Sequence, residues 1–262
     1  MVLDISEHQQ VFDYFAFKAN HPEVLGVILR CGFTGWGKAK SKQKDKKFDE
    51  HYAGFRRVGI PIGVYYYSCA VSVAEAQEEA RLTLQYVKDK QLDFPIWWDT
   101  EDNHDINAPG ASTTSQATIS KSLLTDCAVA YCKAIEEAGY YVGIYASASW
   151  FNNRLDLLRL RAYDKWVAHY GVNTPGVTFA YGMHQFTKNA MVTGHRGYVD
   201  MNWCKRDYPT IIKNAGLNGY KKPSEVDPIL AEIKELEDLL EVISENLKSA
   251  MDLLERIKHE QK

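Results

Sequence analysis

Two acidic residues at the end of an apolar run are the strongest chemical signal in this sequence. The run from Phe94 to Trp98 leads directly into Asp99, and Glu101 follows two residues later. Residues two apart in a β-strand project to the same face, and the rise of ~3.3 Å per residue then separates their carboxylates by roughly 6–7 Å. Enzymes that cleave sugars use such pairs, because one acid holds a proton while its neighbour stays ionised. The spacing predicts acid–base chemistry at the carboxyl end of a strand.

The elements that must position these acids follow an alternating pattern. Short apolar runs alternate with helix-like stretches, such as 73–90 and 118–138, which is typical of βα units. Eight strands are expected, at 2–6, 27–31, 62–68, 94–99, 141–145, 166–169, 179–186 and 198–200. The sequence therefore predicts an α/β fold with a TIM-like (β/α) barrel. Because the helical signal weakens after Tyr145, we expect the later units to be irregular. In such barrels the active site lies at the carboxyl ends of the strands.

Two more acids meet this positional test. Asp4 lies in the first predicted strand and Asp200 in the last, and these strands become neighbours when a barrel closes. Arg30, on the second strand, is expected either to hold these acids ionised or to serve a structural role. Aromatic and amide side chains near strand ends are candidates to line a sugar-binding groove: Tyr65, Tyr67, Tyr145, Tyr170 and Gln185.

Composition narrows the possible functions. A net charge of −3 over 262 residues gives no general attraction to nucleic acid or to an anionic membrane. The five cysteines are odd in number and form no CxxC pair, which argues against a disulfide framework or a zinc site. We expect no metal and no cofactor. The first residues have no basic segment followed by an apolar one, so a protein made in the cytoplasm without a signal peptide is expected.

A change in composition after Asn214 predicts a second part of the chain. Residues 1–214 form the expected catalytic barrel, 215–225 a linker rich in Gly, Lys and Pro, and 226–262 a C-terminal helix. Apolar residues recur there in alternating steps of three and four, from Val226 to Ile257, which is the period of a coiled coil. We expect residues 226–257 to join copies of the chain, with a dimer favoured. The alternative is a helix folded back on the barrel.

Several short blocks of residues 1–210 resemble glycoside hydrolase family 25 lysozymes, the type found among bacteriophage endolysins. The blocks follow one another at plausible spacing: Leu3-Asp4-Ile5-Ser6, Ile28-Leu29-Arg30-Cys31-Gly32, Gly59-Ile60-Pro61-Ile62-Gly63-Val64-Tyr65, Trp98-Asp99-Thr100-Glu101 and Val199-Asp200-Met201-Asn202. The resemblance implies an antimicrobial cell-wall hydrolase that cleaves the β-1,4 bond between N-acetylmuramic acid and N-acetylglucosamine in peptidoglycan. It also implies release to the wall through a holin-type pore.

The resemblance also implies roles for the acids. Glu101 would be the general acid that protonates the leaving oxygen, and Asp99 would either stabilise a cation formed by the substrate's 2-acetamido group or activate water. Asp4 and Asp200 would orient the sugar. The expected separation lies between about 5–5.5 Å for retaining and ~6.5–9.5 Å for inverting enzymes, so the spacing leaves both outcomes open.

Two other functions fit parts of the sequence. A chitinase-like barrel acting on N-acetylglucosamine polymers also ends a strand in Asp-x-Glu, but it predicts further aspartates before the glutamate, and Phe94–Trp98 has none. A catalytically silent wall-binding barrel, presented by a coiled coil, predicts loss of the acid at Glu101. Retention of all four acids favours the hydrolase.

Overall fold

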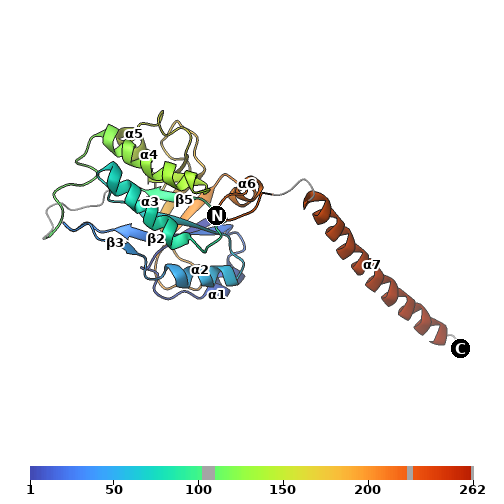
Figure 1. Cartoon of the computed structure of the whole chain (residues 1–262). Coiled ribbons are helices and arrows are strands. Elements are labelled where there is room, and N and C mark those ends of the chain that lie inside the picture. The colour runs from blue at the N-terminus through green and yellow to red at the C-terminus, as the bar shows by residue number, and fades with distance from the viewer. Residues whose placement is uncertain (102–109, 223–226, 261–262) are drawn as a thin grey trace. The chain divides into compact units, whose positions relative to one another are not determined.

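The chain divides into two compact units, residues 1–220 and 221–262, in a computed structural model that describes residues 1–101, 110–222 and 227–260. The first unit is a β-barrel covered by helices, and the second contains one long helix (Figure 1). Each unit is described by itself below.

Eight strands close the barrel, because the first strand pairs with both the second and the last. They are β1 (Val2–Ile5), β2 (Gly26–Thr34), β4 (Ile62–Tyr67), β5 (Ile96–Asp99), β6 (Val142–Ser147), β7 (Asp164–Ala168), β8 (Met183–Ala190) and β9 (Val199–Cys204). A short strand, β3 (Lys42–Lys44), adds to the end of β2 in antiparallel orientation. The predicted α/β barrel is confirmed.

One strand departs from the all-parallel arrangement of a TIM barrel. β9 runs antiparallel to both of its neighbours, β1 and β8. The connection from β8 to β9 spans only residues 191–198, and so short a link joins antiparallel strands, whereas a parallel crossover needs about a dozen residues or more. Residues 169–182, all of them described, contain no helix. These are the irregular later units that the sequence predicts.

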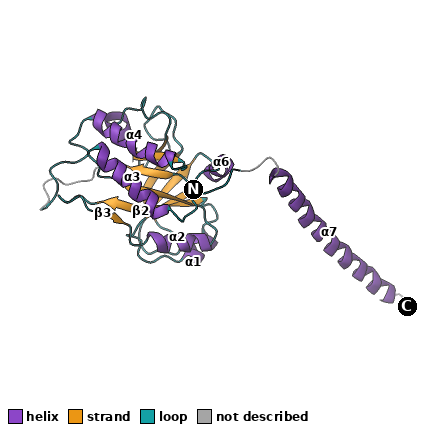
Figure 2. Ribbon diagram, viewed as in Figure 1, coloured by secondary structure: helices purple, strands orange, loops and turns teal. Residues whose placement is uncertain are grey.

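Helices cover the outside of the barrel (Figure 2). They are α1 (Tyr14–Asn20), α2 (Phe48–Arg57), α3 (Val73–Val87), α4 (Lys121–Glu137) and α5 (Ala148–Arg154), with α6 (Tyr208–Ala215) after the last strand. The Ser72 and Ser120 hydroxyls cap α3 and α4 by accepting a backbone N–H of the first turn. Gly139 lies just beyond α4 with φ of 83°, a conformation that favours glycine, and so ends the helix.

Strand alternation sorts the side chains of β5 between two environments. Trp98 faces outward into the main core between barrel and helices, while Trp97 belongs to a second apolar cluster inside the barrel. Gly143 on β6 leaves room for Trp97, since a Cβ there would lie 2.3 Å from its ring. Tyr208 of α6 joins the inner cluster beside Phe94, two residues before β5. The barrel is therefore filled at the end away from the acids, and Asp99 faces inward at the other end.

The second unit is dominated by α7 (Asp227–Glu260). Five apolar side chains that follow the predicted coiled-coil period are 46% to 64% exposed: Ile233, Leu236, Leu240, Ile243 and Leu247. No helix among the described residues is both long and apolar enough to cross a membrane.

Candidate active site

The four predicted acids converge at one end of the barrel. Asp4 of β1, Asp99 of β5 and Asp200 of β9, together with Glu101 directly after β5, line a cavity of about 490 Å³. The same acids border a smaller hollow of about 50 Å³ above the barrel interior, together with Tyr65, Tyr145, Trp166 and Gln185. Closure of the barrel therefore brings together residues that lie almost 200 positions apart in the sequence.

Asp4 and Asp200 face each other across the antiparallel β1–β9 pair. The Gln185 amide donates to both carboxylates, at 3.2 Å to Asp4 Oδ2 and 3.3 Å to Asp200 Oδ2. Asn202 donates a shorter bond of 2.6 Å to Asp4 Oδ2. Burial and the neighbouring Asp200 charge raise the pKa of Asp4 well above its ordinary value, and burial also raises the pKa of Asp200. This pair holds a proton more tightly than exposed carboxylates do.

Gln185 links the acid pair to two tyrosines. Its side-chain oxygen accepts hydrogen bonds from the Tyr145 hydroxyl at 2.7 Å and from the Tyr170 hydroxyl at 2.8 Å. Because the oxygen is occupied by two donors, the amide nitrogen must point toward the aspartates. The three predicted groove residues therefore form one connected network beside Asp4 and Asp200.

Asp99 has the environment expected of a reactive carboxylate. It is 4% exposed, and its Oδ1 receives no hydrogen bond from the described residues. Burial raises the pKa of Asp99 well above its usual range, and the charges of Glu101 and Asp4 raise it further. An unpaired carboxylate oxygen in a cavity is costly for the folded protein. It is free to bind a substrate group.

Arg30 pairs with two acids, and neither of them is one of the four predicted site acids. Its Nε donates to Asp45 Oδ2 at 2.8 Å, and its Nη2 lies 3.3 Å from Glu7 Oε1. It lines the 490 Å³ cavity, and its positive charge lowers the pKa of Asp99, though less than burial raises it. The sequence interpretation is thus refined: the direct partners of Arg30 come from the loops after β1 and β3.

Aromatic side chains border the site on both sides of the acids. Tyr65 and Tyr67 share the inner face of β4 and line the 490 Å³ cavity with Trp36, whose indole donates to the Tyr67 hydroxyl at 3.1 Å. A second cavity of about 830 Å³ shares Glu101 and Asp200 with the first and includes Tyr170. The two cavities form a groove in which Glu101 occupies the middle.

Sequence reasoning missed three contributors to this site. Trp36 follows β2, and its position between Gly35 and Gly37 was the signal available in the sequence. Asn202 belongs to the motif Val199-Asp200-Met201-Asn202, but no role was predicted for it, although it lies two residues from Asp200 on the same strand face. Trp166 donates to Asn202 Oδ1 at 2.7 Å and fixes the orientation of that amide. Among the described residues, no group of three or more His, Cys, Asp or Glu side chains is placed to hold a metal ion.

A closed α/β barrel with paired carboxylates and aromatic groove walls at its strand ends is an arrangement that glycoside hydrolases use. The model of the glycosyl hydrolases family 25 matches residues 3–195, and the chain belongs to this family. The resemblance inferred from the short sequence blocks is confirmed.

Several solved structures share this fold. The modular autolysin LytC from Streptococcus pneumoniae shares 27% identity and a TM-score of 0.65, over 77% of this chain and 45% of that chain. The CTP1L endolysin shares 23% identity with a TM-score of 0.64, over 81% and 69%. A bacterial lysozyme from Streptomyces coelicolor shares 20% identity with a TM-score of 0.63, over 81% and 95%. The last two likenesses concern the fold, and this chain spans less than half of LytC. A comparison with curated proteins gave no match.

Proposed function

We propose that this glycoside hydrolase acts on bacterial peptidoglycan and cleaves the β-1,4 bond between N-acetylmuramic acid and N-acetylglucosamine. The observation that carries the proposal is that Asp99 and Glu101, at the end of β5, both line the 490 Å³ cavity, and that Glu101 also lines the 830 Å³ cavity. The structural neighbours, an autolysin, an endolysin and a lysozyme, support peptidoglycan as the substrate.

Glu101 acts as the general acid in this proposal. It borders both cavities and so can reach a glycosidic oxygen that lies between sugars bound on either side. Asp99 lies next to it, and two adjacent carboxylates resist ionising together, so the pair keeps a proton that Glu101 can transfer. Transfer of this proton to the oxygen makes the departing sugar a neutral alcohol.

Asp99 supports the positive charge that develops on the sugar as the bond breaks. In one route the substrate's 2-acetamido group attacks the anomeric carbon, and the unpaired Asp99 oxygen stabilises the resulting cation. In the other route a carboxylate activates water on the opposite face of the ring. Asp4 and Asp200, held by Gln185, orient the sugar in both routes.

Trp36 is proposed to bind a sugar at one end of the groove, since its indole is 41% exposed within the cavity wall. We expect Trp36→Ala to raise KM for soluble peptidoglycan fragments by about tenfold and to change kcat by less than about threefold, because stacking stabilises bound substrate and transition state alike. Phe15 is an exposed aromatic on α1 outside both cavities. Phe15→Ala is therefore the control and should change neither constant. An unchanged KM for Trp36→Ala would remove this subsite.

The direct test of the function compares two polymers. Purified Gram-positive peptidoglycan and chitin are each incubated with the wild type, and soluble fragments are measured over time. Release from peptidoglycan alone supports a peptidoglycan hydrolase, and release chiefly from chitin supports the chitinase-like alternative. Binding to the wall without release from either polymer supports the silent barrel.

The exposed apolar stripe of α7 supports a second proposal, that this helix joins two copies of the chain as a coiled coil. A single helix cannot bury such a stripe by itself, and its 3.5-residue period matches the helix of a second copy. Paired chains would bind an insoluble wall at two points and so gain avidity without new contacts.

Light scattering after size-exclusion chromatography tests this pairing. We expect the full chain to elute with twice its mass of 29.8 kDa. The double variant Leu236→Glu and Leu240→Glu should elute as a monomer, because it places charges in the apolar seam. The double variant Glu235→Gln and Asp238→Asn changes other positions of the same helix and should stay dimeric. A monomeric wild type would contradict the pairing.

The endolysin likeness also supports a proposed route to the wall. The protein would accumulate in the cytoplasm of a phage-infected cell and reach peptidoglycan through a holin-type pore. Purified protein added from outside would then act as an antimicrobial on Gram-positive cells, whose peptidoglycan is accessible.

A further inference from the structure

A buried carboxylate outside the barrel has no part in the chemistry above. Glu79 of α3 is 0% exposed and accepts four hydrogen bonds. Its Oε1 accepts from the Thr34 hydroxyl at 2.7 Å and from the Cys69 backbone N–H at 3.2 Å. Its Oε2 accepts from the Ser68 hydroxyl at 2.6 Å and from the Trp98 indole at 3.4 Å. Glu79 thereby ties together the carboxyl ends of three neighbouring strands, β2, β4 and β5.

The arrangement requires a carboxylate at this position. Hydroxyl groups can rotate to donate or accept, but the Cys69 N–H and the Trp98 indole N–H can only donate. The Cys69 N–H faces Oε1 of Glu79, and the Trp98 indole N–H faces Oε2. A glutamine in its place would direct its NH₂ group against one of them in either orientation, leaving a buried donor without an acceptor.

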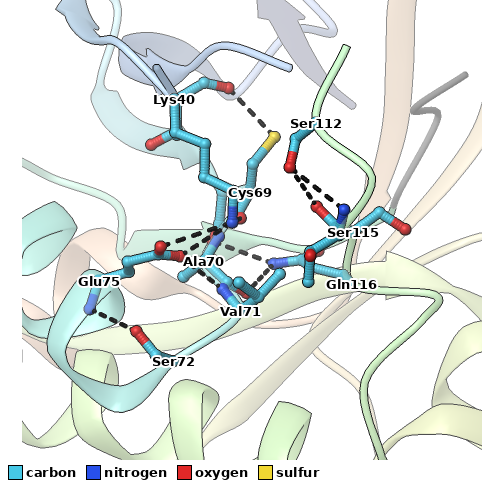
Figure 3. A network of polar contacts seen from close by, with 12 residues as sticks. Lys40, Cys69, Ala70, Val71, Ser72, Glu75, Ser112, Ser115 and Gln116 are labelled. Atoms are coloured by element: carbon cyan, nitrogen blue, oxygen red, sulfur yellow. Dashed lines mark hydrogen bonds and ion pairs between the residues drawn. The ribbon is translucent and has the colours of Figure 1, made fainter. Parts of the chain in front are cut away.

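A chain of hydrogen bonds continues from Glu79 to the segment that carries the acids. The Ser68 hydroxyl accepts from Gln116 Nε2 at 3.2 Å, and Gln116 Oε1 accepts from the Thr100 hydroxyl at 2.8 Å. Gln116 Nε2 also donates to the Ala70 carbonyl at 3.2 Å, at the junction drawn in Figure 3. Thr100 is the residue between Asp99 and Glu101.

Every link of this chain points the same way. The Trp150 indole donates to Thr100 at 3.2 Å, Thr100 to Gln116, Gln116 to Ser68, and Ser68 to the carboxylate. Such aligned bonds strengthen one another in a dry environment. Thr100 and Glu79 are 0% exposed, and Ser68 and Gln116 are 1% exposed, so water does not compete for these links.

We propose that Glu79 is a positioning residue for the glycosidase reaction, which fixes the end of β5 through Ser68, Gln116 and Thr100. This inference rests on the proposed function. Glu79 touches no substrate. It holds the backbone between Asp99 and Glu101, where a displacement of about 1 Å can lower the rate by as much as ~10²-fold.

Steady-state kinetics on peptidoglycan, at a temperature well below the melting point of each variant, tests this role. We expect Glu79→Gln and Ser68→Ala each to lower kcat by roughly tenfold and to leave KM within about twofold, because substrate contacts are intact. The double variant should be no slower than the slower single variant, since both changes break one chain. Glu78→Gln, which alters the exposed neighbour paired with Arg81, is the control and should match the wild type.

The outcomes separate this inference from the proposed function. If the wild type cleaves peptidoglycan and both Ser68→Ala and Glu79→Gln are as fast as the wild type, only the positioning role is overturned. Losses that multiply in the double variant overturn it as well. A wild type that does not cleave peptidoglycan overturns the proposed function. If Glu79→Gln does not fold, Ser68→Ala and Thr100→Val, compared singly and together, test the same chain at its other links.

Discussion

Glu101→Gln is expected to lower kcat on peptidoglycan by about 10²-fold or more, with little change in KM. Glutamine keeps the size and polarity of the side chain but has no acidic proton for the leaving oxygen, and general-acid catalysis contributes typically ~10²–10⁴-fold. The rate at which new reducing ends appear measures the effect. Glu50→Gln, on the exposed outer face of α2, is a charge-matched control that should remain as active as the wild type.

An activated substrate sharpens this test. An aryl glycoside whose leaving group departs as a stable phenolate needs little protonation, so the loss caused by Glu101→Gln should be much smaller on it than on peptidoglycan. An equal loss on both substrates would contradict the role of Glu101 as the acid. So would a Glu101→Gln variant within about threefold of wild type on peptidoglycan.

Asp99→Asn is expected to have two opposite effects, an activity lower by about 10²-fold and a higher melting temperature near neutral pH. The activity falls because asparagine carries no negative charge to stabilise the developing cation or to activate water. Stability rises because burial and neighbouring acids raise the pKa of Asp99 in the folded protein. A group with a raised folded pKa binds its proton more tightly when folded, so its contribution to stability falls as pH rises above the unfolded value.

Thermal unfolding at two pH values checks the stability effect. The melting temperature of Asp99→Asn should exceed that of the wild type at pH 7.5 by a few degrees, as about 1 kcal/mol corresponds to ~2–4 °C in a chain of roughly this size. The difference should shrink toward pH 4, where the wild-type carboxyl keeps its proton. A variant that is less stable than the wild type at pH 7.5 would contradict this account of Asp99.

Local sequence patterns were sufficient to predict which side chains share one face of a strand. The alternation Trp97-Trp98-Asp99 places the acid on the inner face, and the same period places Tyr65 and Tyr67 together, as the structure shows. The position of Asp4 beside Asp200 followed from closure of a barrel, which requires the first and last strands to meet.

Contacts between distant segments could not be read from these patterns. Arg30 pairs with Asp45 because β3 folds back beside β2, and nothing in the basic stretch around Asp45 signals that turn. The direction of β9 depends on a short connection that resembles other loops in composition. The chain of hydrogen bonds from Glu79 to Thr100 joins a helix, two strand ends and a loop. Its donors are common residue types that form no recognisable motif in the sequence.

Analysis of digestion products shows whether the proposed pair, Glu101 and Asp99, cleaves the bond between N-acetylmuramic acid and N-acetylglucosamine. Purified peptidoglycan is digested with the wild type and with Glu101→Gln, and the fragments are identified by mass spectrometry after borohydride reduction of their new ends. We predict reduced N-acetylmuramic acid at the new ends in the wild-type digest and almost none in the variant digest. New ends on N-acetylglucosamine alone, or cut peptides with intact glycan, would show that the enzyme is not a muramidase.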